Sequence, residues 1–214
     1  MKITKFAHAC LKLENKSRVI WIDPGNFSSD FIAETSGAVV ITHLHDDHCH
    51  RPNIEALLKL NPSTKIFSTQ EVADKLDGIE VEVVQHGDSY ELEGFTLEFF
   101  GDQHQEIHRS IPLVQNTAVM VNRKLYYPGD SYTVPEYKPE VIAVPASAPW
   151  LKIADVMDFL EAVRPAKAFP THNALLSEIG HQLQNSRIQQ VVEETGGEFR
   201  YLQPGEYWNL ESNN

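Results

Sequence analysis

The chain has 214 residues, 42% of them hydrophobic, a length and composition that indicate one domain over residues 1–214 with a substantial core. Its 18 lysines and arginines oppose 30 aspartates and glutamates, giving a formal net charge of −12, which argues against nucleic acid and anionic membranes as partners. The 2 cysteines form no C-x-x-C pair, so no thiolate zinc site is indicated. Without a signal-peptide core or a run of about 18 apolar residues, we expect a cytoplasmic protein that acts on a small molecule, with a homo-oligomer left open.

The first part of the chain alternates apolar and polar residues in the manner of strands. Segments 2–6, 9–14 and 18–22 are joined by short turns, which favours an antiparallel meander. A D-P-G sequence at 23–25 ends the third strand with turn chemistry. The apolar run 38–41 then predicts a short strand that is buried on both faces.

From Pro52 onward, helical and strand patterns alternate. Strands are predicted at 65–67, 80–84, 95–100, 117–121, 125–127, 141–144, 166–169 and 201–208, with 117–121 and 125–127 as a hairpin. Helices are predicted from Pro52, over 71–76 and 153–163, and through a late apolar stripe of Leu176, Ile179, Leu183, Ile188, Val191 and Val192. This order indicates an α/β protein of mixed sheets with outer helices.

The segment Thr42 to His48 concentrates three histidines and two aspartates directly behind the predicted strand 38–41. Imidazole and carboxylate are the ligands that hold zinc, manganese or iron in proteins. His43 and His45 are two residues apart, so in extended chain their rings project to one side. Asp47 and His48 follow after the chain turns and can face a second point. The spacing therefore supplies two half-sites for metal.

Three later strand ends carry further residues that can bind metal. They are His104 with His108 after 95–100, Asp130 after 125–127, and His172 after 166–169. Open α/β sheets place their sites at the carboxyl edge of the strands, so each of these side chains is a candidate metal ligand.

The spacing H-x-H-x-D-H after an apolar strand resembles the signature of the metallo-β-lactamase superfamily. His8, Pro128-Gly129-Asp130 and Pro170-Thr171-His172 resemble its branch that contains L-ascorbate-phosphate lactonase. The resemblance implies a four-layered αββα sandwich and two divalent metal ions, zinc or manganese, with iron also accepted. By the same resemblance, His43, His45 and His104 would hold one ion, Asp47, His48 and His172 the other, and Asp130 would bridge them.

The resemblance further implies a hydrolase in which a metal-bridging hydroxide cleaves a small ester, lactone or phosphodiester. Candidate catalytic residues are Asp47, Asp130 and His8. In the family, a histidine near the position of His8 faces the metals without being one of the ligands. Asp23 is expected to support the segment Thr42 to His48, the ligand loop. His104 is preferred over His108 as a ligand because it lies closer to the preceding strand. Two alternatives stay open, a mononuclear iron oxidoreductase of the persulfide dioxygenase kind and a non-enzymatic metal-binding protein.

Overall fold

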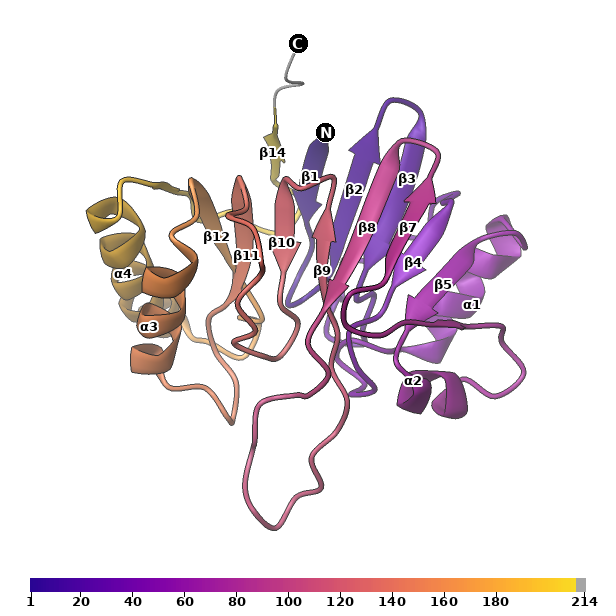
Figure 1. Cartoon of the computed structure of the whole chain (residues 1–214), viewed down its shortest axis with the longest axis horizontal. Helices are drawn as coiled ribbons and strands as arrows, with labels where there is room; N and C mark the ends of the chain where they lie inside the picture. Colours follow the sequence, from indigo (N-terminus) through magenta and orange to yellow (C-terminus); the bar gives the residue numbers. More distant parts are fainter. Residues whose placement is uncertain (211–214) are drawn as a thin grey trace.

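The computed structural model describes residues 1–210, which fold into two seven-stranded sheets with two helices outside each (Figure 1). In spatial order the first sheet contains β14 (Tyr207–Asn209), β1 (Lys2–Lys5), β2 (Leu11–Asn15), β3 (Arg18–Ile22), β4 (Ala38–Val40), β5 (Lys65–Ser68) and β6 (Glu82–Val83). The second contains β13 (Glu198–Phe199), β12 (Lys167–Thr171), β11 (Val141–Pro145), β10 (Leu125–Tyr127), β9 (Ala118–Val121), β8 (Phe95–Phe100) and β7 (Ser89–Leu92).

The hydrophobic residues form three layers of core, which confirms the predicted αββα sandwich. The inner faces of the two sheets, with Leu13 on one side and Leu97 on the other, pack against each other. Helices α1 (Arg51–Leu60) and α2 (Gln70–Lys75) cover the first sheet through a second cluster. Helices α3 (Ile153–Val163) and α4 (Glu178–Glu194) cover the other sheet through a third.

Both sheets combine an antiparallel part with a parallel part. The predicted meander β1–β2–β3 is antiparallel, as is the hairpin β9–β10, whereas β3 to β6 and β10 to β13 pair in parallel. The ends of β4, β8, β10 and β12 lead into the segments that carry the metal-binding residue types. In Figure 1 this edge lies at the bottom, where the long connection between β8 and β9 projects from the body.

Several boundaries differ from the sequence prediction. Strand β7 was not expected, and the strand predicted at 80–84 shrinks to the two residues of β6. The segment 201–208 is strand only from Tyr207. In α4 the predicted stripe is buried only in its second half, because Ile179 and Leu183 are 70% and 65% exposed while Ile188 is fully buried. The single domain over 1–214 stays a prediction, and residues 211–214 lie outside the described part.

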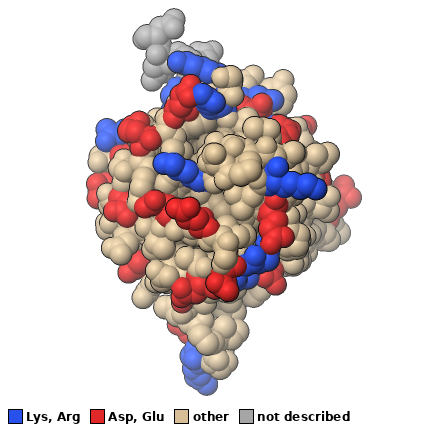
Figure 2. Space-filling view, turned by 90° about the vertical axis from the view of Figure 1, so that its right-hand side faces the viewer, with Lys and Arg blue, Asp and Glu red and all other residues tan. Residues whose placement is uncertain are grey.

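Charged side chains of both signs are interspersed over the face formed by α1, α2 and their sheet edge (Figure 2). Within residues 1–210, no helix is long and apolar enough to cross a membrane.

Candidate metal centre

The loop after β4 is held in place by Asp23, whose carboxylate is completely buried. Its Oδ1 accepts the backbone N–H of Thr42 at 2.7 Å, and its Oδ2 accepts the Thr42 hydroxyl at 2.7 Å. The Nδ1 of His48 lies 2.7 Å from the same Oδ2. One carboxylate therefore fixes both ends of the ligand loop, as the sequence predicts for Asp23.

The loop turns between His45 and Cys49, where the carbonyl of His45 accepts N–H groups from His48 at 3.0 Å and Cys49 at 2.8 Å. This turn separates the two predicted half-sites. The rings of His43 and His45 have centroids 4.8 Å apart and face His104. On the other side, Asp47 and His48 face His172 and His8.

Three overlapping groups of side chains have ligand atoms within 4.8 Å of one another. The groups are His43, His45 and His104; His43, His48 and Asp130; and His8, Asp47, His48 and His172. All seven predicted ligands therefore converge on one place at the edge of the two sheets. The ligand roles themselves are proposals.

Asp130 occupies the middle of this cluster. Its Oδ2 lies 3.3 Å from Nε2 of His104 and 3.2 Å from Nε2 of His172, and its Oδ1 lies 3.3 Å from Nε2 of His48. Asn116 positions the segment, because its Oδ1 accepts the N–H of Asp130 at 3.0 Å while its amide donates to the carbonyl of Pro128. The carboxylate thus reaches both half-sites from one fixed backbone.

The outward nitrogens of the histidines are engaged. Nδ1 of His104 and Nδ1 of His172 each lie 2.5 Å from a backbone carbonyl, of Gln105 and Ser147 respectively, so both must carry the proton and donate. Nδ1 of His48 donates to Asp23 in the same way. Nδ1 of His43 lies 3.0 Å from the Thr42 hydroxyl, which already donates to Asp23 and therefore accepts here.

The inward nitrogens are buried, and although three of them lie 3.2–3.3 Å from the carboxylate of Asp130, none makes a well-directed hydrogen bond to any described residue. They are Nε2 of His43, His48, His104 and His172, and Oδ1 of Asp130 shares the same condition. Buried polar atoms are normally satisfied, and imidazoles whose other nitrogen is hydrogen-bonded are typical metal ligands. The donor set therefore fits divalent metal ions.

Charges inside the cluster shift several pKa values. Burial would raise the pKa of Asp130 and Asp47, but the surrounding histidines outweigh it and hold both values well below the usual range. Burial would lower the pKa of His172, yet Asp130 and Asp47 raise it to about 9. The pKa of His48 is raised in the same way by Asp130 and Asp23, whereas burial lowers that of His43. In the protein without metal, these shifts favour the protonated forms of His48 and His172.

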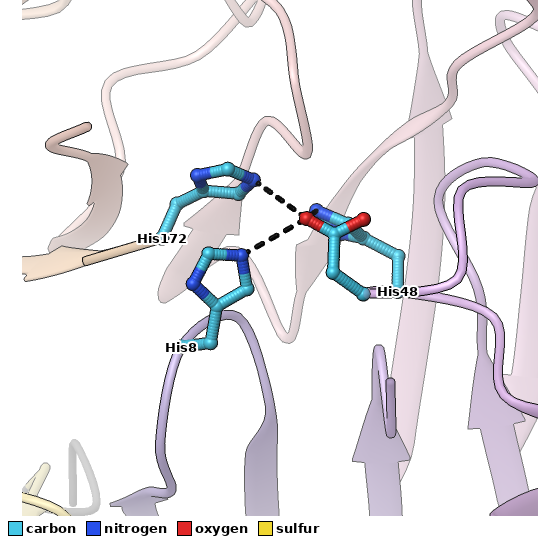
Figure 3. Close-up of side chains that lie close together, drawn as sticks. His8, His48 and His172 are labelled. Atoms are coloured by element: carbon cyan, nitrogen blue, oxygen red, sulfur yellow. Dashed lines mark hydrogen bonds and ion pairs between the residues drawn. The ribbon is translucent and has the colours of Figure 1, made fainter. Parts of the chain in front are cut away.

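His8 lies beside the cluster and contacts Asp47. Its Nδ1 accepts the N–H of Ala174 at 3.3 Å, so its Nε2–H donates to Oδ2 of Asp47 at 3.0 Å. His172 approaches the same oxygen at 3.3 Å, and Figure 3 shows His8 and His172 aimed at this carboxylate with His48 behind it. Burial lowers the pKa of His8 to about 4, so the ring is neutral. These contacts give His8 the position of a residue that orients Asp47.

Trp150 and His104 both lie next to Asp130. Trp150, at 8% exposure, donates its indole N–H to Oδ2 of Asp130 at 3.0 Å. Its place after β11 put it on the site's side of the sheet, but the hydrogen bond was not predicted. His104 is buried beside Asp130, whereas His108 is exposed and pairs with Ser110. The geometry therefore favours His104 over His108.

An open pocket of about 440 Å³ leads from solvent to this cluster. Its floor contains His45, Asp47, His104, Asp130 and His172.

Comparison with known proteins places this geometry in a family. The model described as "Beta-lactamase superfamily domain" matches residues 2–172. The chain belongs to the beta-lactamase superfamily. Protein Rv0786c of Mycobacterium tuberculosis is 34% identical over 198 residues, covering 90% of this chain and 93% of that protein.

Solved structures agree on the fold of this beta-lactamase superfamily member. Igni18, a metallo hydrolase from Ignicoccus hospitalis, superimposes with a TM-score of 0.73 at 21% identity, covering 98% of this chain and 99% of that chain. The metallo-beta-lactamase fold protein YhfI from Bacillus subtilis gives 0.74 at 14% identity, covering 97% and 98%. The superfamily and fold predicted from the sequence are thus confirmed, and the likeness to the lactonase branch stays a prediction.

Proposed function

We propose that the chain is a binuclear metal-dependent hydrolase that cleaves a small ester, lactone or phosphodiester. The observation that carries the proposal is the group of four buried imidazole Nε2 atoms around the Asp130 carboxylate at the floor of an open pocket, none of which makes a well-directed hydrogen bond within residues 1–210. A cytoplasmic location and a small-molecule substrate belong to the same proposal.

The residues would divide into two sets. His43, His45 and His104 would hold one ion, Asp47, His48 and His172 the other, and Asp130 would contact both. Two zinc or manganese ions bound there would supply a hydroxide at neutral pH and polarise the substrate oxygen.

The chain's own groups orient this chemistry. For an ester, the oxygen of water bonds to the carbonyl carbon, the bond from that carbon to the leaving oxygen breaks, and the leaving oxygen takes up a proton. Asp130 lies at the centre of the floor and would orient the attacking oxygen, while the Trp150 N–H holds its carboxylate in one rotamer. His8 holds the carboxylate of Asp47 in place in the same way, by donating a hydrogen bond from its Nε2–H.

Metal content is the first test. Elemental analysis of the purified, untagged protein is expected to find about two zinc or manganese ions per chain. About one iron per chain, with oxygen uptake on a persulfide, would instead support the mononuclear oxidoreductase. Metal bound tightly without turnover of any ester, lactone or phosphodiester would support a non-enzymatic binding protein.

Substitution of the central carboxylate tests the mechanism. Asp130→Asn is expected to abolish turnover while the thermal unfolding transition is retained, because the amide removes the charge between the half-sites. Asp102→Asn, an exposed residue at the start of the same long connection as His104, is the control and keeps activity. Full turnover in Asp130→Asn would refute the proposed mechanism.

A further inference from the structure

The walls of the pocket differ in character from its floor. Phe27, Ile107, Pro149, Trp150 and Leu175 line them. They come from four separate loops: Phe27 from the β3–β4 loop, Ile107 from the β8–β9 connection, Pro149 and Trp150 from the segment after β11, and Leu175 from the turn after β12. Apolar side chains from distant parts of the sequence thus surround one opening.

Two of these side chains are unusually exposed for their size. Phe27 is 41% exposed and Leu175 is 60% exposed. Phe27 is also held in position, because its ring packs edge-on against His8 with centroids 5.1 Å apart. Exposed apolar surface at the mouth of a pocket, next to a few convergent polar groups, is typical of a ligand-binding wall.

No lysine or arginine is among the described residues that line the pocket. Arg109, two positions beyond Ile107, is not one of them. Asp46 at the rim is neutralised by Lys75, whose ammonium donates to its Oδ1 at 2.6 Å. A carboxylate or phosphate carried on the outer part of a substrate would therefore lie against apolar walls without a charged partner, which is unfavourable.

We infer that this pocket selects substrates whose group beside the scissile bond is apolar and uncharged, such as the aliphatic or aromatic acyl group of an ester, rather than phosphorylated or carboxylated ones. The inference rests on the proposed function and adds the substrate class. Each methylene that leaves water is worth about 0.8 kcal/mol, or about fourfold in binding.

Two esters that differ only in a terminal charge provide the test. The metal-loaded protein is assayed with the 4-nitrophenyl ester of hexanoic acid and the mono-4-nitrophenyl ester of adipic acid, which has the same number of carbons and a terminal carboxylate. We expect kcat/KM to be at least about tenfold higher for hexanoate, because the carboxylate lacks a partner.

A matched pair of variants locates the effect. Leu175→Lys places a cation in the wall and is expected to reduce the hexanoate preference about tenfold. Ile179→Lys adds the same charge four residues further along, in α4, at a side chain that is 70% exposed and does not line the pocket. This variant is expected to keep the wild-type ratio.

A binding measurement separates this inference from the proposed function. Titration calorimetry compares hexanamide with adipamic acid, its carboxylated counterpart, on the metal-loaded protein. Tighter binding of hexanamide without turnover of either ester would preserve the pocket assignment and overturn ester hydrolysis. Equal turnover of the two esters, or preference for adipate, would overturn the inference and leave the hydrolase standing.

Discussion

Single side chains around the two half-sites were predictable to different degrees. The seven proposed ligands converge as expected because the segments that carry them follow strands that end at one edge of the two sheets. The supporting role of Asp23 was also predictable, because Asp23 begins the D-P-G turn that ends β3. The Trp150 contact with Asp130 could not be predicted, because it depends on the path of the loop after β11. The sequence preferred His104 over His108 because it lies closer to β8, and the structure places His104 beside Asp130.

Asp23 tests whether hydrogen bonds to the proposed ligands and their loop control metal affinity. In Asp23→Asn one carboxylate oxygen becomes an NH2 group, which donates and cannot accept the hydrogen bonds that Thr42 and His48 make to Asp23. We expect the metal dissociation constant, measured by competition with a chelator, to rise about 10-fold to 100-fold. The control is Asp30→Asn in the β3–β4 loop, whose carboxylate accepts the N–H of Ala7 at 2.9 Å. Among residues 1–210, Asp30 has no hydrogen bond or ion pair with a proposed ligand. Equal affinities in the two variants would contradict the role of Asp23.

Trp150 tests whether the central carboxylate must be held in place. Trp150→Phe keeps an aromatic ring but removes a hydrogen bond to a charged group, worth about 1.5 kcal/mol at the lower end. We expect kcat to fall about tenfold with metal content unchanged. Trp208→Phe, a buried tryptophan of β14 in the core between the sheets, should leave kcat at the wild-type value. An unaltered kcat in Trp150→Phe would show that Asp130 needs no such support.

Strands were easier to predict than the packing of helices. The alternation in β1 to β3 and the short turns between them predicted an antiparallel meander, and the structure confirms it. In α4 the stripe predicted a continuous buried face, yet Ile179 and Leu183 in the first half of the helix are exposed. Periodicity shows which residues share a helix face, but not how far the neighbouring elements extend along it. Strand β7 was missed because Ser89 to Leu92 forms an edge with alternating half-exposed positions.

The β3–β4 loop and the ligand loop are interlocked, and Gly25 permits the contact. A Cβ atom at Gly25 would lie 1.7 Å from the backbone oxygen of Asp47. Gly25→Ala must therefore displace the ligand loop, and we expect it to lower the free energy of unfolding by at least about 3 kcal/mol and to reduce metal binding. Gly37→Ala in the same loop meets its nearest atom at 3.8 Å and should change stability by about 0.5 kcal/mol or less. Denaturant unfolding of both variants measures the two effects. Similar midpoints would show that the close contact between Gly25 and the ligand loop does not matter for stability.

The stability of the protein as a whole should depend on metal and pH together. Without metal, His172 has a pKa raised to about 9 from 6.5, and His48 is raised as well. A raised pKa means that protonation stabilises the folded state, so this contribution is complete below pH 6.5 and is lost as the pH rises through about 9. Metal binding requires the same nitrogens without protons, so it releases protons in this interval and strengthens as the pH rises.

Chelator treatment at several pH values tests this linkage. The difference in unfolding temperature between the metal-loaded and the metal-free protein is expected to grow from pH 6.5 to 8.5, because the metal-free form loses stability while the metal binds more tightly. Each proton released changes the metal dissociation constant about tenfold per pH unit. His172→Gln removes one of the two titrating groups and should reduce this slope without eliminating it, since His48 still pairs with Asp130. A difference that is constant with pH would mean that metal does not displace protons from these histidines, and the assignment of His48 and His172 as ligands would be wrong.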